Sequence, residues 1–382
     1  MSIISKMTNR IQHLLLWKRR ESVRKMFGRY FNKIIRLNPE FSVASDKTAE
    51  KKWADKWGVF GQKPNTKIYK FYKYYLGDNE NILPNDIGRN FIEPVLTPEE
   101  YQPFYNDKNS FGIFLDKSMM PKTYIHAMNN LILDENYEAV GKDYIPKVLE
   151  SLDKVVVKPT KEMGGKGVSI FTRKEGQLVD NEGNILTFEY LHKTYKTDYL
   201  IQECFTQSEF MGQFNPTSVN TLRIAVLRDV ESGELSIIGA FIRIGGKGAV
   251  VDNISLGGSS VAIDVTNGKL GKFACDISRV KHSVYNDINF ADNEFVIPNW
   301  DKVKAFVLDV ARRMPHMSLF ANDIALDVDN NPKLIEINTT EFSYTFYQVS
   351  GTPFFGKNTD KIIEYCLREN KRLNPFVTLK KN

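Results

Sequence analysis

Cysteine is scarce in this chain, and the few cysteines form no pattern. Cys204, Cys275 and Cys366 are odd in number and far apart, so they supply neither a disulfide framework nor the spacing of a metal-binding cluster. The histidines after residue 100 show no metal-ligand spacing either. No apolar run approaches the ~18 residues that a membrane-spanning helix needs, and residues 14–17 are too few for the core of a signal peptide. These absences favour a protein of the reducing cytosol.

Acidic residues are nearly absent from the first 38 positions. That segment holds ten Lys or Arg and one acid, Glu21, whereas the whole chain of 382 residues has a net charge of +6. The basic character therefore belongs to one end of the chain. The composition is otherwise ordinary for a globular protein, with 42% hydrophobic and 26% charged residues. The length predicts two or three domains.

The basic segment carries the pattern of a helix. Apolar residues recur at spacings of three and four, which places them on one face; they are Ile4, Met7, Ile11, Leu14 and Leu15. Arginines and lysines, Arg10 among them, crowd around that stripe, and Asn38-Pro39 gives a stop signal. The sequence leaves three interpretations of residues 1–38 open: peripheral contact with an anionic membrane surface, docking on the rest of the protein and, least favoured, contact with nucleic acid.

The next segment divides into two parts. Residues 40–80 combine charged residues typical of helices with many aromatic side chains. They predict a packed helical segment rather than a base-stacking surface, because no nucleic-acid-binding motif accompanies them. The stretch from Ile82 to Pro103 contains four prolines and predicts an extended connector.

From about residue 104 onward, strands and helices are interspersed. Runs of β-branched and apolar residues predict strands at 155–157, 169–171, 199–202, 222–227 and 237–244. Apolar residues that recur at helical spacing on one face predict a helix over 301–314. Two further strands, 323–328 and 333–337, are expected to form a hairpin turned at residues 329–332.

A lysine and a glycine-rich turn give the first chemical signal. Lys158 ends a predicted strand, and Gly164, Gly165 and Gly167 lie in the turn to the next strand. Glycines let a backbone loop approach another group closely, and their N–H groups can face phosphate oxygens. The spacing is neither a Walker A loop nor a dinucleotide fingerprint. A plain glycine-rich hairpin is the alternative interpretation.

Three oxygen-bearing side chains late in the chain give the second signal. Glu336 and Asn338 are two apart and share one face of a strand, and Asp323 begins the partner strand of the hairpin. Two carboxylates and an amide are hard ligands of the kind that Mg²⁺ accepts. The alternative is a polar hairpin face turned to water. A phosphate-holding half followed by a metal-holding half is what an ATP-dependent enzyme needs.

In this order the motifs resemble the ATP-grasp superfamily, and within it the sugar-transfer-associated ATP-grasp family. The resemblance extends from about residue 92 to residue 356, and its motifs are Asn106-Asp107-Lys108, Lys158-Pro159 with residues 164–168, Gln202-Glu203, residues 215–223, Val251-Asp252-Asn253 with Gly257-Gly258, and residues 323–338. The fold implied is α+β, with two α+β subdomains that grip ATP and a helical N-terminal region. We expect that basic helical region at 1–90, the N-terminal subdomain at 91–155, the lid at 156–210 and the C-terminal subdomain with the metal site at 211–382.

The resemblance also implies a role for each motif. Lys108 (with Lys117 as its rival) and Lys158 would reach the phosphates of ATP under a lid formed by Gly164, Gly165 and Gly167. Gln202, Glu203, Cys204 and Phe205 would hold the adenine, and Glu209 the ribose. Asp323, Glu336 and Asn338 would bind Mg²⁺. Arg223 and Arg243 would lie near the transferring phosphate, and Asn253 beside the acceptor.

The reaction implied is ATP-dependent ligation, in which a carboxylate becomes an acyl phosphate and an amine or other nucleophile then displaces the phosphate. The family's name suggests a small-molecule or lipid-linked glycan substrate in cell-surface polysaccharide biosynthesis, in the cytoplasm or at the inner face of the plasma membrane. A phosphotransferase acting on a hydroxyl is the alternative, and a binding module without chemistry is a third.

One departure from the family's pattern concerns the acceptor. Many ATP-grasp ligases follow the metal-binding asparagine with a Pro-Gly turn near the acceptor. This chain continues instead with Thr339-Thr340-Glu341-Phe342. The departure leaves the expected ATP and metal residues in place and leaves the identity of the acceptor open.

Overall fold

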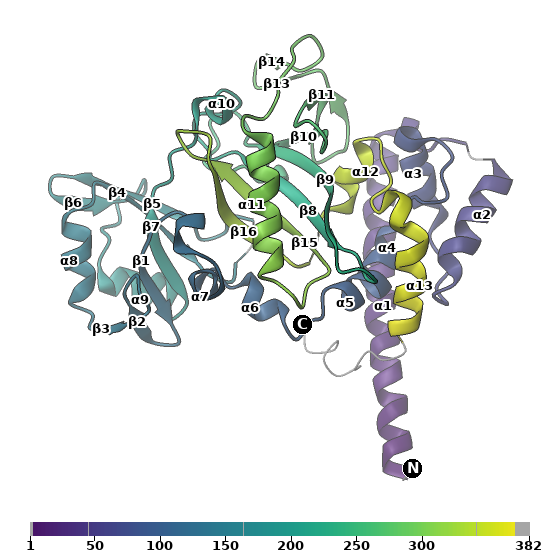
Figure 1. Cartoon of the computed structure of the whole chain (residues 1–382), viewed down its shortest axis with the longest axis horizontal. Helices are drawn as coiled ribbons and strands as arrows, with labels where there is room; N and C mark the ends of the chain where they lie inside the picture. Colours follow the sequence, from purple (N-terminus) through teal and green to yellow (C-terminus); the bar gives the residue numbers. More distant parts are fainter. Residues whose placement is uncertain (1–2, 45, 163, 341, 371–382) are drawn as a thin grey trace.

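The computed structural model of the chain describes residues 3–370 except 45, 163 and 341, with side chains from residue 11 onward. Within these residues the strands form two seven-stranded sheets and one two-stranded sheet, and several helices gather around the N-terminal segment (Figure 1). The expectations for the side chains of Ile4, Met7 and Arg10, and for Glu341, lie outside the described part, as do residues 371–382 of the expected C-terminal subdomain.

The first sheet has the strand order β3-β2-β1-β7-β4-β5-β6, and its neighbouring strands are antiparallel. Its strands are β1 (Thr123–Met128), β2 (Leu131–Leu133), β3 (Ala139–Val140), β4 (Lys154–Pro159), β5 (Ser169–Lys174), β6 (Gln177–Val179) and β7 (Tyr199–Glu203). The boundary that we expected between residues 155 and 156 falls inside β4, and the strands on its two sides share this one sheet.

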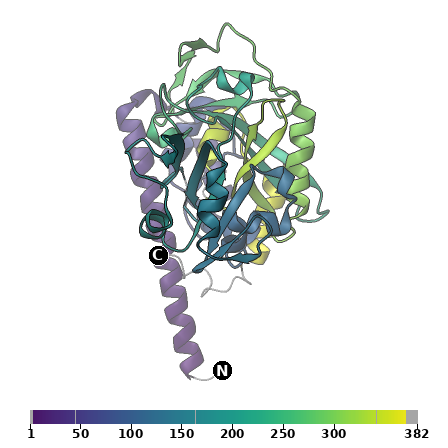
Figure 2. The same cartoon turned by 90° about the vertical axis from the view of Figure 1, so that its left-hand side faces the viewer.

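Alternation along β4 gives the first sheet two different faces. Val155 and Val157 are fully buried in an apolar core, which helices α8 (Tyr144–Glu150) and α9 (Phe188–Tyr195) complete. Val156 and Lys158 point the other way, since successive side chains of a strand alternate, and both line a cavity. Figure 2 faces this part of the molecule. One strand thus supplies both the core and the wall of a candidate site.

The second sheet has the order β12-β11-β10-β9-β8-β15-β16. Its strands are β8 (Thr221–Arg228), β9 (Leu235–Ile244), β10 (Ser259–Ile263), β11 (Leu270–Cys275), β12 (Lys281–His282), β15 (Leu319–Leu326) and β16 (Pro332–Asn338), while β13 (Val284–Tyr285) and β14 (Ile288–Asn289) form the small sheet. Helix α11 (Trp300–Arg312) covers one face of this sheet (Figure 1) and buries Val303, Val307 and Val310. The predicted hairpin and the helix at 301–314 are therefore confirmed, although β15 begins at Leu319 rather than Asp323.

Helices α1 (Ile3–Leu37), α2 (Lys47–Gly58) and α3 (Thr66–Leu76) form the N-terminal region. Side-chain caps start two of them, because Asp46 accepts a hydrogen bond from Thr48 N at 2.7 Å and Asn65 accepts one from Lys67 N at 3.0 Å. Most of the aromatic residues that we expected to pack do so: Trp53, Trp57, Tyr69, Phe71 and Tyr72 are fully buried, whereas Tyr74 is 48% exposed. The helical prediction for residues 1–80 is confirmed in outline.

The N-terminal region shares its core with the second sheet. The Tyr72 hydroxyl donates to Thr345 at 3.1 Å, and Leu83 and Gln348 exchange backbone-to-amide hydrogen bonds of 2.8 and 3.1 Å. Thr345 and Gln348 belong to α12 (Tyr344–Val349), and α13 (Thr359–Glu369) packs beside it. One apolar cluster therefore runs from the first helices to the end of the described chain.

The extended connector expected between Ile82 and Pro103 was wrong. The chain there is helical, in α4 (Asn85–Ile87), a π-helical turn (Gly88–Ile92) and α5 (Glu93–Leu96), followed by α6 (Gln102–Asn106), α7 (Phe111–Phe114) and, later, α10 (Glu209–Gly212). Pro84 precedes α4, and Pro94 and Pro103 lie in the first turns of α5 and α6. A proline is tolerated there because its missing N–H would have no partner in the helix. Of the helices in the described part, none has both the length and the apolarity needed to cross a membrane.

Candidate functional site

A cavity of about 190 Å³ lies where the two sheets face each other. Its walls include twelve of the residues that the sequence predicted, namely Lys108, Lys158, Gly164, Gly165, Gln202, Glu203, Cys204, Phe205, Arg243, Asn253, Asp323 and Glu336. Four other predicted residues, Gly167, Glu209, Arg223 and Asn338, do not line it. Residues that are more than 200 positions apart in the chain thus meet around one cavity.

Two lysines reach this cavity from different elements. Lys108 Nζ donates to Glu336 Oε1 at 2.8 Å and to the carbonyl of Glu162 at 3.0 Å. Burial and, to a smaller extent, the nearby Lys108 ammonium lower the pKa of Lys158 to about 7, and Glu336 opposes them. Lys117, the rival of Lys108, instead donates to Asn136 at an exposed position and does not line this cavity. Lys158 is therefore an ammonium that lacks enough negative charge around it.

The glycine-rich turn closes over the cavity. Gly164, Gly165 and Gly167 have φ of +69°, +76° and +70°, which L-residues with side chains rarely adopt. A Cβ atom at Gly164 would lie 2.9 Å from Asn253 Nδ2, and one at Gly165 would lie 3.1 Å from Val251. The Asn253 amide also donates to the Gly164 carbonyl at 2.8 Å. The glycine-rich turn is therefore hydrogen-bonded to a loop that follows strand β9 of the second sheet.

The β7 end of the cavity has polar side chains that are already engaged. The Gln202 amide donates to Thr123 Oγ1 at 2.9 Å, and Glu203 accepts a hydrogen bond from Lys122 N at 2.8 Å. Apolar side chains such as Val156 and Ile335 line the wall nearby. An apolar slot of this kind suits a flat aromatic ring. Glu209 is exposed on α10 and lies away from this slot.

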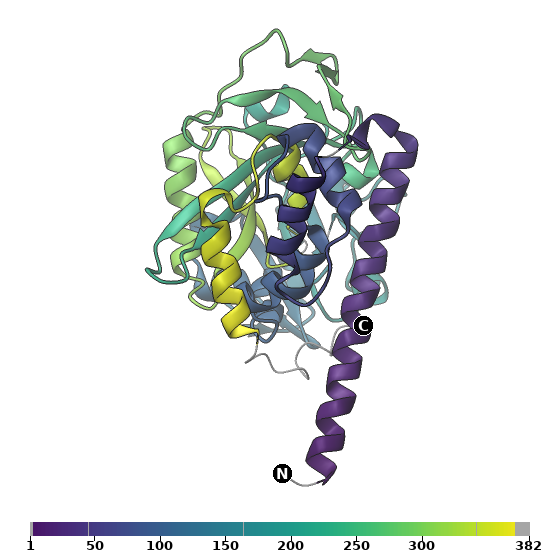
Figure 3. The ribbon, with the colours of Figure 1, turned by 90° about the vertical axis from the view of Figure 1, so that its right-hand side faces the viewer.

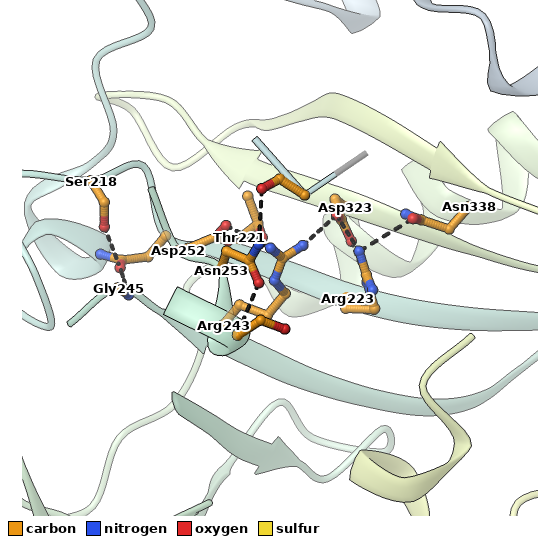
Figure 4. Close-up of polar contacts among 12 residues, drawn as sticks. Ser218, Thr221, Arg223, Arg243, Gly245, Asp252, Asn253, Asp323 and Asn338 are labelled. Atoms are coloured by element: carbon orange, nitrogen blue, oxygen red, sulfur yellow. Dashed lines mark hydrogen bonds and ion pairs between the residues drawn. The ribbon is translucent and has the colours of Figure 1, made fainter. Parts of the chain in front are cut away.

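A buried charge network forms the opposite wall (Figure 4). Arg223 holds Asp323 through two hydrogen bonds of 2.7 and 2.6 Å, and Arg243 contacts the same carboxylate at 2.7 Å. Arg243 also donates to Asp252 at 2.8 Å, and Asp252 accepts from the Thr221 hydroxyl. Burial acts to raise the pKa of Asp323, but the two guanidinium groups outweigh it and hold the pKa below its ordinary value.

Strand register fixes which oxygens face each other. Asp323 lies directly opposite Glu336 in the β15–β16 ladder, and Asn338 lies opposite Ala321 on the same face. Asn338 Oδ1 accepts a hydrogen bond from Arg223 at 3.3 Å. The register thus groups all three predicted metal ligands, although Asn338 sits one step behind the cavity wall.

The donor set fits Mg²⁺ in kind. Two carboxylates and an amide oxygen are hard ligands, and Mg²⁺ commonly takes few protein ligands because phosphate oxygens and water complete its shell. In the described part of the chain, no group of three or more His, Cys, Asp or Glu side chains is arranged to hold a metal ion. Asp323 is also held by two arginines, so Glu336 is the carboxylate that faces the cavity most freely.

The structure adds residues that sequence reasoning missed. Asp252, whose motif gave it no role of its own, pairs with Arg243 and lines the cavity beside Thr221. Its position directly before Asn253 was the available signal. Burial raises the pKa of Asp252, although Arg243 opposes this effect. Arg223, expected near the transferring phosphate, lies behind Asp323 instead of in the wall.

The chain is similar to a known protein family and to several solved structures. The family model described as sugar-transfer associated ATP-grasp matches residues 96–362. Among solved structures, D-alanine–D-alanine ligase from Bacillus anthracis is 13% identical with a TM-score of 0.37, and the match covers 70% of this chain and 69% of that chain. D-cycloserine synthetase DcsG is 11% identical (TM-score 0.37; 72% and 73% covered), and the ATP-grasp ligase PsnB with precursor peptide and AMPPNP is 12% identical (TM-score 0.39; 86% and 76% covered). No curated protein matches the chain.

Proposed function

The chain belongs to the sugar-transfer-associated ATP-grasp family, and from that premise we propose that it is an ATP-dependent ligase. Its fold class is accordingly α+β and ATP-grasp, with a helical N-terminal region. The observation that carries the proposal is the cavity in which Lys108, Lys158 and the glycine turn face Glu336 and Asp323. Cations and N–H groups on one side and carboxylates on the other are what a metal-bound triphosphate requires.

The residues divide the work between binding and exclusion of water. Lys108 and Lys158 neutralise phosphate charge, and the backbone N–H groups of the glycine turn donate to phosphate oxygens. Glu336, Asp323 and Asn338 would hold Mg²⁺, which when bound supplies further positive charge at the phosphates. The Asn253–Gly164 contact keeps the turn closed and so protects an acyl phosphate from hydrolysis.

The proposed chemistry has two displacements. A carboxylate oxygen of the acceptor attacks the γ-phosphorus, the bond to the β-phosphate oxygen breaks, and ADP leaves. An amine or other nucleophile then attacks the acyl carbon, and inorganic phosphate leaves. Arg243 lines the cavity between Asp323 and Asp252, and in this proposal it would contact the transferring group.

A more specific part of the proposal concerns the acceptor substrate and the cellular compartment of the reaction. We propose a small-molecule or lipid-linked glycan precursor as the acceptor, in cytoplasmic steps of cell-surface polysaccharide assembly. The family's description as sugar-transfer associated supports the glycan. The free state of Cys204, Cys275 and Cys366 agrees with a reducing compartment.

A substrate screen tests the proposal directly. The full chain is incubated with Mg·ATP, candidate carboxylates and amines, ADP release is followed, and the product is identified by mass spectrometry. Ligation gives ADP, phosphate and a new amide or related bond. A stable phosphoester with no free phosphate would replace the ligase by the phosphotransferase alternative. Failure of the purified chain to bind Mg·ATP at all would overturn both.

A further inference from the structure

Helix α1 presents one continuous line of exposed side chains away from the body. The residues recur at spacings of three and four, so they share one helical face, and all are exposed; they are Ile11, Leu15, Lys18, Ser22, Lys25, Arg29, Lys33 and Arg36, here called the outer stripe. Figure 3 shows α1 along the outside of the molecule with its N-terminal half projecting beyond the body. The outer stripe is therefore open to a partner.

The opposite side of α1 fixes its orientation. Arg19 pairs with Glu99 at 2.5 Å, the Arg20 guanidinium lies 4.1 Å from the centre of the Phe91 ring, and Asn90 donates to the Arg20 carbonyl at 3.0 Å. Further along, Phe31 is fully buried and Ile34 is 5% exposed. Because these contacts hold the inner side, the outer stripe cannot turn inward without unpacking the core.

The outer stripe is divided by chemistry along its length. At the N-terminal end Ile11 is 57% exposed and Leu15 42%, and the neighbours Leu14 and Trp17 are 51% and 61% exposed. From Lys18 to Arg36 the charged residues of the stripe are all basic, over a span of about 27 Å at 1.5 Å per residue. Within the described residues Lys18, Arg29, Lys33 and Arg36 form no ion pair, whereas Lys25 lies 3.7 Å from Glu21.

We propose that the outer stripe is a docking surface for an anionic lipid bilayer. Basic residues near an anionic bilayer are attracted by its surface potential, and the exposed side chains of Ile11 and Leu15 can enter the interfacial region. Nucleic acid would use the basic part but would leave the apolar end in water. This surface lies on the helical region and not on the nucleotide cavity, so the proposal stands independently of the ligase chemistry.

Vesicle sedimentation with the full chain tests the proposal. The probes are vesicles of phosphatidylcholine alone and of phosphatidylcholine with one third phosphatidylglycerol. The chain is expected to bind only the anionic vesicles, and added salt is expected to weaken binding. In the stripe variant Lys18→Gln/Arg29→Gln/Lys33→Gln/Arg36→Gln, the partition coefficient should fall at least about a hundredfold, since each basic residue near the surface contributes roughly fivefold.

A matched variant separates position from net charge. Lys142, Lys154, Lys174 and Lys193 are exposed residues of the first-sheet region, and changing all four to Gln removes the same charge. This control should bind anionic vesicles within about twofold of the unchanged chain, while Ile11→Ser/Leu15→Ser should weaken binding about tenfold. All altered side chains are exposed, and thermal melts confirm folding.

Three outcomes would overturn the docking surface. The first is no binding to anionic vesicles by the unchanged chain. The second is equal weakening by the stripe variant and the control variant. The third is binding to single-stranded RNA, lost in the stripe variant, without any binding to vesicles, which would assign the stripe to nucleic acid instead.

Discussion

The first-sheet side of the cavity contributes two ammonium groups, from Lys108 and Lys158, and Glu336 of the opposite sheet lies near them as a counter-charge. The second sheet contributes two guanidinium groups, from Arg223 and Arg243, together with the carboxylates of Asp323 and Asp252. One wall is therefore short of negative charge and the other is balanced. A balanced network supports the structure, whereas an unbalanced one gains stability when an anion arrives.

Asp323→Ala should remove the shared carboxylate of the charge network and lower the free energy of unfolding more than any other change. Two buried guanidinium groups would lose their shared partner, which costs about 3–5 kcal/mol for a buried pair. Urea unfolding measures this loss. Asp327→Ala, in the turn after β15, is the control with a smaller expected loss, because its partners there are backbone and amide groups of the turn. Equal losses would contradict a structural role for the Asp323 network.

Glu336→Ala should come next, and its effect should fall on turnover rather than folding. Glu336 is the carboxylate that faces the cavity and holds Lys108, and its removal should lower kcat by about 10²–10³, the size seen for a lost electrostatic contact in an active site. Steady-state ADP release measures this. Glu234→Ala, at an exposed position of the turn between β8 and β9, should leave kcat unchanged. Normal turnover in Glu336→Ala would mean that the metal residues are misassigned.

Lys158 should make the folding stability of the chain depend on pH. Its pKa is about 7 in the folded chain against an ordinary value of 10.5, so between these values the unfolded chain binds more protons and stability rises with pH. Below pH 7 the folded ammonium is charged and its burial penalty is fully present. Lys158→Met should remove this slope and raise stability at pH 6, while ATP affinity falls. Urea unfolding across pH 6–10 measures the slope.

The lowered pKa of Lys158 also predicts that the protein takes up a proton when ATP binds. Phosphate charge would return the pKa of Lys158 toward 10.5, so ATP binding at pH 8 should take up about 0.9 proton, and at pH 6 about 0.1. Calorimetry in two buffers with different ionisation enthalpies counts that proton. Uptake that persists unchanged in Lys158→Met would assign it to another group.

Asn253→Ala should have the smallest effect. It removes one hydrogen bond between the glycine turn and the second sheet, which contributes about 1 kcal/mol or roughly fivefold in the KM for ATP. The ratio of ATP hydrolysed to product ligated should also rise, because the turn opens more often. Asn293→Ala, whose side chain bonds only within its own exposed loop, is the matched control.

Much of the site could be predicted because its parts are local in sequence. The period-2 pattern around residues 323–338 fixes a hairpin, and a hairpin fixes which residues face each other. The glycines likewise mark a turn by conformation alone. The family resemblance supplied the order of the parts, and the match over residues 96–362 confirms the family.

The rest depended on contacts that sequence spacing does not encode. Arg223 lies behind Asp323 because β8 pairs with β15, a pairing across 100 residues. The helical turns at residues 85–96 were misread because proline is compatible with both an extended chain and a helix start. The role of Asp252 follows from its distance to Arg243, which only the folded chain shows.

The shared core of the N-terminal helices and α12 sets the rule for trimming this protein. Phe31, Trp53 and Tyr72 are interior residues of the same cluster that contains Phe241 of β9 and Tyr347 of α12. Shortening the chain from its start would therefore remove part of this shared core and leave a large apolar surface in water. The N-terminal helices are part of the core of the protein, and an expression fragment that begins at residue 96 is expected to aggregate.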